Sequence, residues 1–443
     1  MLMHTRHRLT RVPLLTLLAL LALPVLPDRA TARSRGTARP GAVVYVGKRG
    51  RSRNLRYQPI RGGRSFWLTH TAKTPTAVAC TADGRWVTYA EDGKVYARRL
   101  TRQGKPILLH TLPKSLWQLH QHQLRSFIHN SPTGRHVALP DPEGIRVFDL
   151  KTKTVLLIKP PTTGDTITKV RVIHPARWLP GHDSLLYLTQ SGDKGAGEVK
   201  ARVFDLVQGR HTLWFPVLSG SVDEVEGYDA AWNTAGTRVA LSLAVRIGQK
   251  HLTRLKIFSV NPYTELKLPG RLRVGRLHGF DPHLGDIVFT ARLGGATAKL
   301  WSYSFTRKRR RLLDIGYLGA GRMVIGFYPS RRSALIAAPL RGKCTGRTKL
   351  FKASVRFRQG SLVRWARWSQ IVATNPSRTW FVFRSGSTCT HKKPVLYLMQ
   401  ADGNGLLRDL PRRFGALRTV APVDAALCPH PPQKKRPRRR GRR

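Results

Sequence analysis

Four carboxylates stand close together in a chain that is otherwise strongly basic. Asp223, Glu224, Glu226 and Asp229 lie within the segment SVDEVEGYDAAW, whereas the whole chain has 79 basic and 23 acidic residues. Grouped carboxylates repel one another unless a cation or a basic group joins them. The segment therefore indicates a site for a cation or a basic ligand, and the alternative is a surface patch whose acids pair with local arginines.

The second group of residues with chemical potential is the four cysteines, Cys80, Cys344, Cys389 and Cys428. In an oxidising compartment we expect all four to be paired, and four cysteines allow three connectivities. The spacing of the cysteines alone does not choose among them.

Motifs for common catalytic chemistry are absent from the sequence. It has no G-x-S-x-G, H-E-x-x-H, C-x-x-C-H or Walker-type loop, so the usual nucleophile, zinc, haem and nucleotide sites are not indicated. Five histidines gather in one stretch, but strand alternation brings only two onto one face, and zinc needs three or four ligands. We therefore expect no metal, cofactor or catalytic residue. These histidines are His110, His120, His122, His129 and His136.

A repeated unit carries these residues. In SPTGRHVAL, Ser131 to Leu139, a proline turn leads into an alternating strand whose first inward residue, Val137, follows Pro132 by five positions. Proline presets the turn, and a period-2 strand buries alternate residues. The corresponding inward residues, called anchors below, are Val43, Val87, Val137, Leu185, Val239, Ile287, Ala334 and Phe381, at spacings of 44, 50, 48, 54, 48, 47 and 47 residues.

Each unit continues into a second strand that carries an aromatic residue in a fixed place. The first unit departs from this pattern, because Arg56 stands at that place with Tyr57 beside it. Aromatics in register predict one packing layer that is repeated from unit to unit. The seven aromatics are Tyr96, Phe148, Phe204, Phe258, Trp301, Phe351 and Tyr397.

The period predicts the architecture. Units of about 48 residues with several short strands and no long helical pattern are typical of the blades of a β-propeller. A β-sandwich is the competing all-β architecture, but it shows turn signals without a fixed period. We predict a single all-β propeller over residues 42–432, with eight blades from the count of turns and seven as the alternative.

The two ends of the propeller are predicted to meet in one blade. A strand-like piece precedes every turn except the first, and Arg418 to Pro432, RTVAPVDAALCPHPP, can supply the missing one. Cys428 then falls within one position of the place that Cys80 has in the next blade. The repeat frame therefore selects the pair Cys80–Cys428, and it leaves Cys344 and Cys389 in corresponding loops of adjacent blades.

The units SPTGRHVAL and IRVFDL resemble the repeats of TolB-type and WD40-like propellers, which read S-P-D-G, an apolar strand, and then L-Y-V-x-D-L. The resemblance covers roughly residues 42–432. It implies propeller blades and says little about activity. The stretch before the first unit is too short for the α/β domain that precedes the propeller in TolB.

The N-terminus has the features of a secretory signal. Arg6, Arg8 and Arg11 precede an apolar run from Val12 to Leu26, and Ala30-Thr31-Ala32 forms a cleavage site. The run is short for a membrane span, which favours a cleaved signal peptide; an uncleaved anchor is the alternative. We expect a signal peptide over 1–32, a linker over 33–41, a basic disordered tail over 433–443, and export to the periplasm or beyond.

The formal charge is +56, of which the signal segment and the tail contribute +3 and +8, which leaves +45 on the rest of the chain. A field of this sign attracts polyanions; the alternative is compositional drift toward arginine. We expect a non-enzymatic binding or scaffold protein whose partners are envelope proteins or anionic envelope polymers or lipids. Sequence-specific nucleic-acid motifs are missing, and an enzyme with an unrecognised site in the central channel is the alternative function.

Overall fold

The computed structural model describes a series of ranges between Gly41 and His430. The predicted signal peptide and basic tail lie outside it. All described residues belong to one compact unit, Gly36–Arg443. The ranges are 41–60, 63–114, 127–161, 170–191, 197–218, 224–233, 235–260, 263–268, 272–280, 285–293, 299–312, 323–328, 333–339, 348–354, 360–362, 369–374, 380–385, 395–400 and 425–430.

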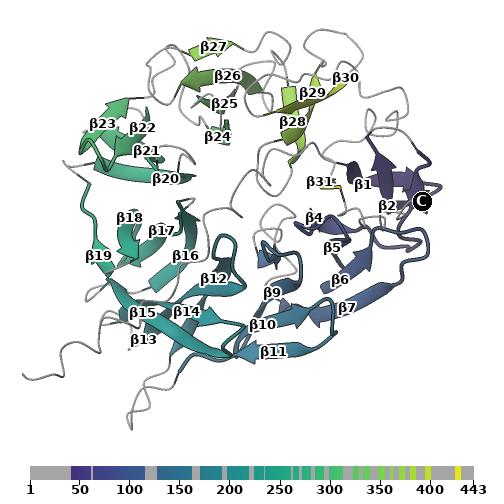
Figure 1. Ribbon diagram of the computed structural model, residues 1–443, viewed down its shortest axis with the longest axis horizontal. Helices are drawn as coiled ribbons and strands as arrows, with labels where there is room; N and C mark the ends of the chain where they lie inside the picture. Colours follow the sequence, from purple (N-terminus) through teal and green to yellow (C-terminus); the bar gives the residue numbers. More distant parts are fainter. Residues whose placement is uncertain are drawn as a thin grey trace, which may run out of the picture. The chain divides into compact units, whose positions relative to one another are not determined.

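The elements of these ranges are β-strands, which pair antiparallel in seven sheets (Figure 1). The all-β prediction is confirmed. Sheet 1 contains β1 (Ala42–Arg49), β2 (Ser52–Pro59), β3 (Phe66–Trp67) and β31 (Ala425–Cys428). Sheet 2 contains β4 (Thr76–Cys80), β5 (Trp86–Glu91), β6 (Lys94–Arg99) and β7 (Pro106–Thr111). Sheet 3 contains β8 (His129–Asn130), β9 (His136–Asp141), β10 (Gly144–Asp149) and β11 (Val155–Ile158).

The next three sheets are built in the same way, with strands in chain order. Sheet 4 contains β12 (Arg171–Trp178), β13 (Ser184–Ser191), β14 (Glu198–Asp205) and β15 (Arg210–Leu218). Sheet 5 contains β16 (Glu224–Trp232), β17 (Arg238–Ile247), β18 (Lys250–Val260) and β19 (Tyr263–Glu265). Sheet 6 contains β20 (Leu272–Phe280), β21 (Ile287–Leu293), β22 (Lys299–Ser304) and β23 (Arg309–Leu312).

Sheet 7 joins two groups of strands through one residue pair, Thr348 opposite Ser369. Each group begins with an antiparallel pair of strands, as the other sheets do. The described strands therefore follow the eight predicted units. The number of blades in the complete propeller stays a prediction. The first group is β24 (Met323–Tyr328), β25 (Ser333–Pro339), β26 (Thr348–Ser354) and β27 (Gly360–Leu362). The second group is β28 (Ser369–Thr374), β29 (Trp380–Ser385) and β30 (Val395–Gln400).

Sheet 1 is assembled from both ends of the described chain. β31 pairs antiparallel with β1, with Cys428 opposite Ala42, and the backbone N–H of Gly41 donates to the Cys428 carbonyl at 2.8 Å. β31 also lies against β4 of sheet 2 and β28 of sheet 7. Contacts of the same kind join β8 to β12, β12 to β16, and β16 to β20. In sheets 3 to 6, as in sheets 1 and 2, the first strands of successive sheets are therefore neighbours.

The core lies between successive sheets. The anchors Val43, Val87, Val137, Leu185 and Val239 have no exposed surface, and neither has Ile287; the side chains of Ala334 and Phe381 lie outside the described set. Each buried cluster draws on two neighbouring sheets, for example sheets 1 and 2 or sheets 4 and 5. Because each buried aliphatic side chain contributes about 1.5–3 kcal/mol, the alternation stabilises one sheet against the next.

The aromatic layer of the second strands has two registers. Phe148, Phe204 and Phe258 lie opposite their anchors. Tyr96, Trp301, Phe351 and Tyr397 lie opposite the residue two positions after the anchor. A shift of two residues keeps the same face of the sheet, so hairpins of different register still present the aromatic to the same layer. In sheet 1, Arg56 lies opposite Tyr45.

The described residues contain no helix that is long and apolar enough to cross a membrane.

Candidate functional site

β16 carries three of the four predicted acidic residues. Asp223 lies outside the described residues. Along β16, Val225 and Tyr228 are buried in the cluster between sheets 4 and 5. A β-bulge between Val225 and Gly227 places Glu226 as an extra residue in the strand. Burial of the apolar neighbours leaves Glu224 half-buried and Glu226 and Asp229 exposed.

Two arginines hold Glu224. Arg171 of β12 donates to Oε1 at 2.7 Å, and Arg246, opposite Glu224 on β17, donates to Oε2 at 2.6 Å. These hydrogen bonds lower the pKa of Glu224 below its usual range. Arg171 also donates to Gln190 at 2.9 Å and to the Val225 carbonyl at 3.1 Å. The carboxylate therefore joins sheet 4 to sheet 5 through charge-assisted hydrogen bonds.

Asp229 takes part in a second connection, which spans three sheets. Its Oδ1 accepts from Arg177 Nη2 at 3.0 Å, and Arg177 also donates to the ring of His129 on β8. Trp178 Nε1 donates to the His129 carbonyl at 2.9 Å. A guanidinium has no acceptor, so the ring nitrogen of His129 that faces Arg177 accepts the hydrogen bond. These hydrogen bonds link the first strands of sheets 3, 4 and 5.

Glu226 contacts His251, whose Nδ1 lies 2.9 Å from the carboxylate, and this contact is the most exposed of the three. Each described acid of the cluster thus has a basic partner, as in the surface-patch alternative. A cation would have to displace arginine from Glu224 or Asp229, and no group of three His, Cys, Asp or Glu side chains able to hold a metal occurs in the described ranges. The role of the cluster toward a ligand stays a prediction.

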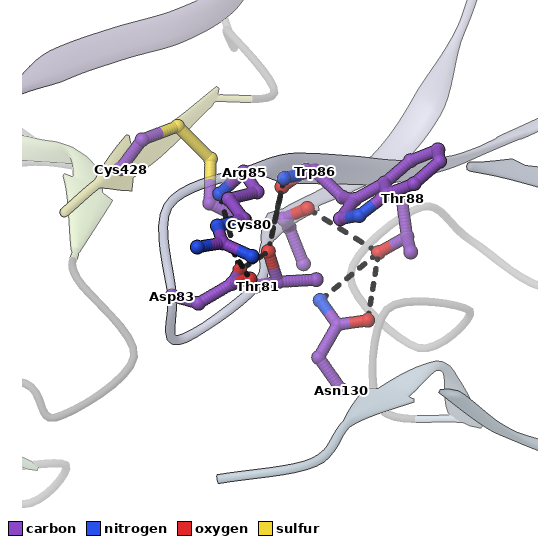
Figure 2. Close-up of a disulfide and its surroundings, with 9 residues drawn as sticks. Cys80, Thr81, Asp83, Arg85, Trp86, Thr88, Asn130 and Cys428 are labelled. Atoms are coloured by element: carbon purple, nitrogen blue, oxygen red, sulfur yellow. Dashed lines mark hydrogen bonds and ion pairs between the residues drawn. A yellow bond between two sulfur atoms is a disulfide. The ribbon is translucent and has the colours of Figure 1, made fainter. Parts of the chain in front are cut away.

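The structure contains the predicted bond between Cys80 and Cys428, with Cα atoms 5.3 Å apart (Figure 2). Both cysteines are buried. The separation is well within the roughly 7 Å limit for a disulfide, because β4 and β31 are first strands of neighbouring sheets. The other two predicted disulfide cysteines, Cys344 and Cys389, lie outside the described residues.

The turn after Cys80 is held by its own side chains (Figure 2). Thr81 Oγ1 donates to Asp83 at 2.6 Å and accepts from the Trp86 N–H at 3.0 Å. Gly84 has φ +67°, and a Cβ there would lie 2.3 Å from the Pro429 carbonyl oxygen. Glycine at this place lets the turn pack closely against the segment that follows Cys428.

Two of the five histidines in the histidine-rich stretch, His110 and His136, lie near different carboxylates. His120 and His122 lie outside the described residues. His110 is 3.7 Å from Asp141, and His136 lies 3.6 Å from Asp149 and 3.3 Å from Asp183. These carboxylates belong to the turns and strand ends of sheets 3 and 4, so the histidines contribute to packing between hairpins.

Sequence reasoning did not single out Asp149. Burial raises the pKa of this carboxyl, but hydrogen bonds from Arg135 and from the backbone N–H groups of Lys151 and Thr152 outweigh that effect and lower the pKa to about 2. Asp205 accepts two backbone N–H groups at the same place in sheet 4. The repeated F-D-L of the second strands was the signal for these turns.

The basic side chains outnumber their acidic partners at the surface. Most described carboxylates contact a basic group of the chain itself, such as Glu143 with Lys159 and Glu265 with Lys256. Many exposed basic residues of the hairpin turns have no described carboxylate within 4.0 Å. Examples are Arg51, Arg102, Lys105, Lys151, Arg307, Lys308 and Arg309.

Comparison with known proteins identifies the fold. No family model matches the chain, and no curated protein matches it in sequence. A dipeptidyl peptidase 4 from Porphyromonas gingivalis is similar in structure, with a TM-score of 0.53 and 11% identity over 87% of this chain. The chain spans 62% of the length of that peptidase chain.

Two further structures are similar. The dihydro-heme d1 dehydrogenase NirN has a TM-score of 0.50 and 13% identity, and the match covers 87% of this chain and 75% of that one. The β-propeller domain of the Trilobed protease from Pyrococcus furiosus has a TM-score of 0.41 and 10% identity, over 72% and 93% of the two chains. The consecutive antiparallel sheets, with the likenesses to the peptidase and the dehydrogenase, show that the chain is a β-propeller.

Proposed function

We propose that the protein is an exported, non-enzymatic β-propeller that binds anionic polymers or lipids of the cell envelope and acts there as a binding or scaffold protein. The observation that carries the proposal is the surplus of exposed basic side chains on a surface where most described carboxylates already have basic partners in the protein. Because many of these basic groups have no carboxylate partner among the described residues, they can bind a polyanion. Binding then releases the counterions that were condensed on the polyanion.

Two observations support the compartment. The Cys80–Cys428 bond joins two buried cysteines, and stable disulfides of this kind are typical of oxidising compartments. The signal-like residues 1–32 supply the route of export. The pairing of β31 with β1 in sheet 1 would give such a scaffold a rigid frame.

Fractionation of cells that express the full chain tests the proposal. We expect the protein outside the cytoplasm, with an N-terminus at Arg33, bound to the envelope at low salt and released by a salt wash, because surface charge attraction is screened within about 8 Å at physiological ionic strength. An intact N-terminus on protein that stays in the cytoplasm would contradict export. Envelope association that resists both salt and a competing polyanion would contradict the electrostatic basis.

A further inference from the structure

The hairpin between β22 and β23 has the longest run of basic residues among the described hairpins. Five successive residues, Arg307–Arg311, are basic, and they form the end of the turn and most of β23, the outermost strand of sheet 6. Residues 305–312 are called the basic hairpin below. The hairpin occupies an edge of its sheet, where a long ligand can approach without entering a cleft.

Three basic residues of this hairpin are exposed to solvent, where a ligand can reach them. Arg307, Lys308 and Arg309 are exposed, and Arg310 and Arg311 are half-buried. Within the described part of the chain, Arg307–Arg310 form no ion pair with a carboxylate. In the neighbouring sheet 5, by contrast, Lys256 is neutralised by Glu265 at 2.7 Å.

Strand pairing and ring contacts hold the backbone of the hairpin. Arg309, Arg310 and Arg311 pair in register with Ser304, Tyr303 and Ser302 of β22. Phe305 begins the turn, with its ring 5.1 Å from that of the buried Tyr303. The guanidinium of Arg238 in sheet 5 lies over the Phe305 ring, 4.7 Å from its centroid. The backbone that carries these residues is therefore in place before a ligand binds, which lowers the entropy cost of binding.

The composition of the hairpin favours phosphate. Four of the five basic residues are arginines, whose planar forks bind phosphate oxygens two at a time. Arg307, Lys308 and Arg309 are exposed and follow one another directly, so they suit neighbouring anionic groups of one chain. Arg310 lies over the Trp301 ring at 5.8 Å and adds a further charge.

A polymer fits this surface better than a lipid bilayer does. Interfacial binding elements place large apolar side chains beside their basic ones, but the exposed large apolar residues of the described chain lie in sheets 3, 4 and 5 and in β7 of sheet 2, and not in sheet 6. We propose that the basic hairpin is the principal contact of this protein for linear polymers that carry phosphate groups. The inference rests on the proposed function, because it assigns a general affinity for anions to one element.

The test compares two triple variants of the full chain, each with three exposed basic residues replaced by glutamine. Arg307→Gln/Lys308→Gln/Arg309→Gln removes charge from the basic hairpin. Arg102→Gln/Lys105→Gln/Lys151→Gln removes the same charge from the corresponding hairpin turns of sheets 2 and 3. Binding of end-labelled inorganic polyphosphate is followed by fluorescence anisotropy over a range of salt, and thermal unfolding confirms that both variants are folded.

We expect the hairpin variant to bind polyphosphate on the order of tenfold more weakly at low salt, since it loses three exposed ion pairs. Its slope of log affinity against log salt should be smaller in magnitude by about 2, the counterions of three contacts. The control variant should stay within about twofold of the parent protein.

Other results overturn the assignment in distinguishable ways. Equal weakening of both variants would show that the charge acts diffusely, so the hairpin would lose its role while the proposed function stands. Preference of the parent for polyglutamate over polyphosphate would overturn the choice of phosphate. Tighter binding to phosphatidylglycerol vesicles than to polyphosphate would overturn the choice of a polymer. Binding of the parent to none of these probes would refute both the hairpin site and the proposed function.

Discussion

Removal of the Cys80–Cys428 bond should destabilise the protein at the place where its two ends meet. The bond joins positions 348 residues apart and ties β31 to β4, while β31 itself has only four residues paired with β1. The perturbation is the double variant Cys80→Ala/Cys428→Ala, which leaves neither cysteine with an unpaired thiol.

The magnitude follows from the length of the closed loop. In the chain-entropy model a loop of this length restricts the unfolded chain by about 5–6 kcal/mol at 25 °C. Measured losses on removing a native disulfide are about 2–5 kcal/mol, so we expect a loss near 4 kcal/mol. Spread over the unfolding entropy of a chain of this size, that loss lowers Tm by on the order of 5 °C.

The assay is guanidinium-induced unfolding of the parent protein and the double variant, with amide hydrogen exchange on the same samples. Exchange should rise first in β31 and in its partner Ala42–Tyr45, because these strands lose their covalent tie. Peptide mapping without reduction should recover Cys80 linked to Cys428. Equal stability of the two proteins, or Cys80 linked to Cys344 or Cys389, would refute the reasoning about the blade register.

Three further changes have expected outcomes. Burial lowers the pKa of His174 to about 4, whereas the unfolded chain binds the proton near pH 6.5. The free energy of unfolding, measured by urea titration, should therefore fall by about 3 kcal/mol from pH 6.5 to pH 4. The fall should be smaller in His174→Gln. Glu224→Gln should cost about 1 kcal/mol in urea unfolding and Glu226→Gln less than about 0.5, because only Glu224 joins two arginines; equal costs would contradict this. Gly84→Ala should lower stability by about 2 kcal/mol or more, against about 1 for Gly181→Ala, which has the same sign of φ but no atom within 4 Å; similar Tm values would show that the turn can move away from Pro429.

Features that depend on one strand and its turn could be predicted from the sequence. The six described anchors are buried because alternation and a tight turn fix them locally. The pairing of Cys428 with Cys80 followed from counting positions within the repeat unit. The same pattern of turn and strand places each cysteine within its own unit.

Features that depend on pairing between strands could not be predicted in the same way. The shift of two residues between Phe148 and Tyr96 reflects the register of each hairpin, which the aromatic pattern alone does not reveal. Arg171, one partner of Glu224, and Arg177, the partner of Asp229, lie more than fifty positions earlier in the chain, on another sheet. The acidic cluster was visible in the sequence, and its neutralisation was visible only in the structure.

The central claim is that uncompensated surface charge binds anionic polymers, and the salt dependence of binding by the parent protein tests it most directly. Affinity for heparin, measured by anisotropy from about 50 to 200 mM salt, should fall along a straight line in log affinity against log salt with a slope steeper than about −2, because several contacts release counterions together. A neutral dextran of similar size should not bind. A slope near zero, or equal binding of dextran, would contradict the account.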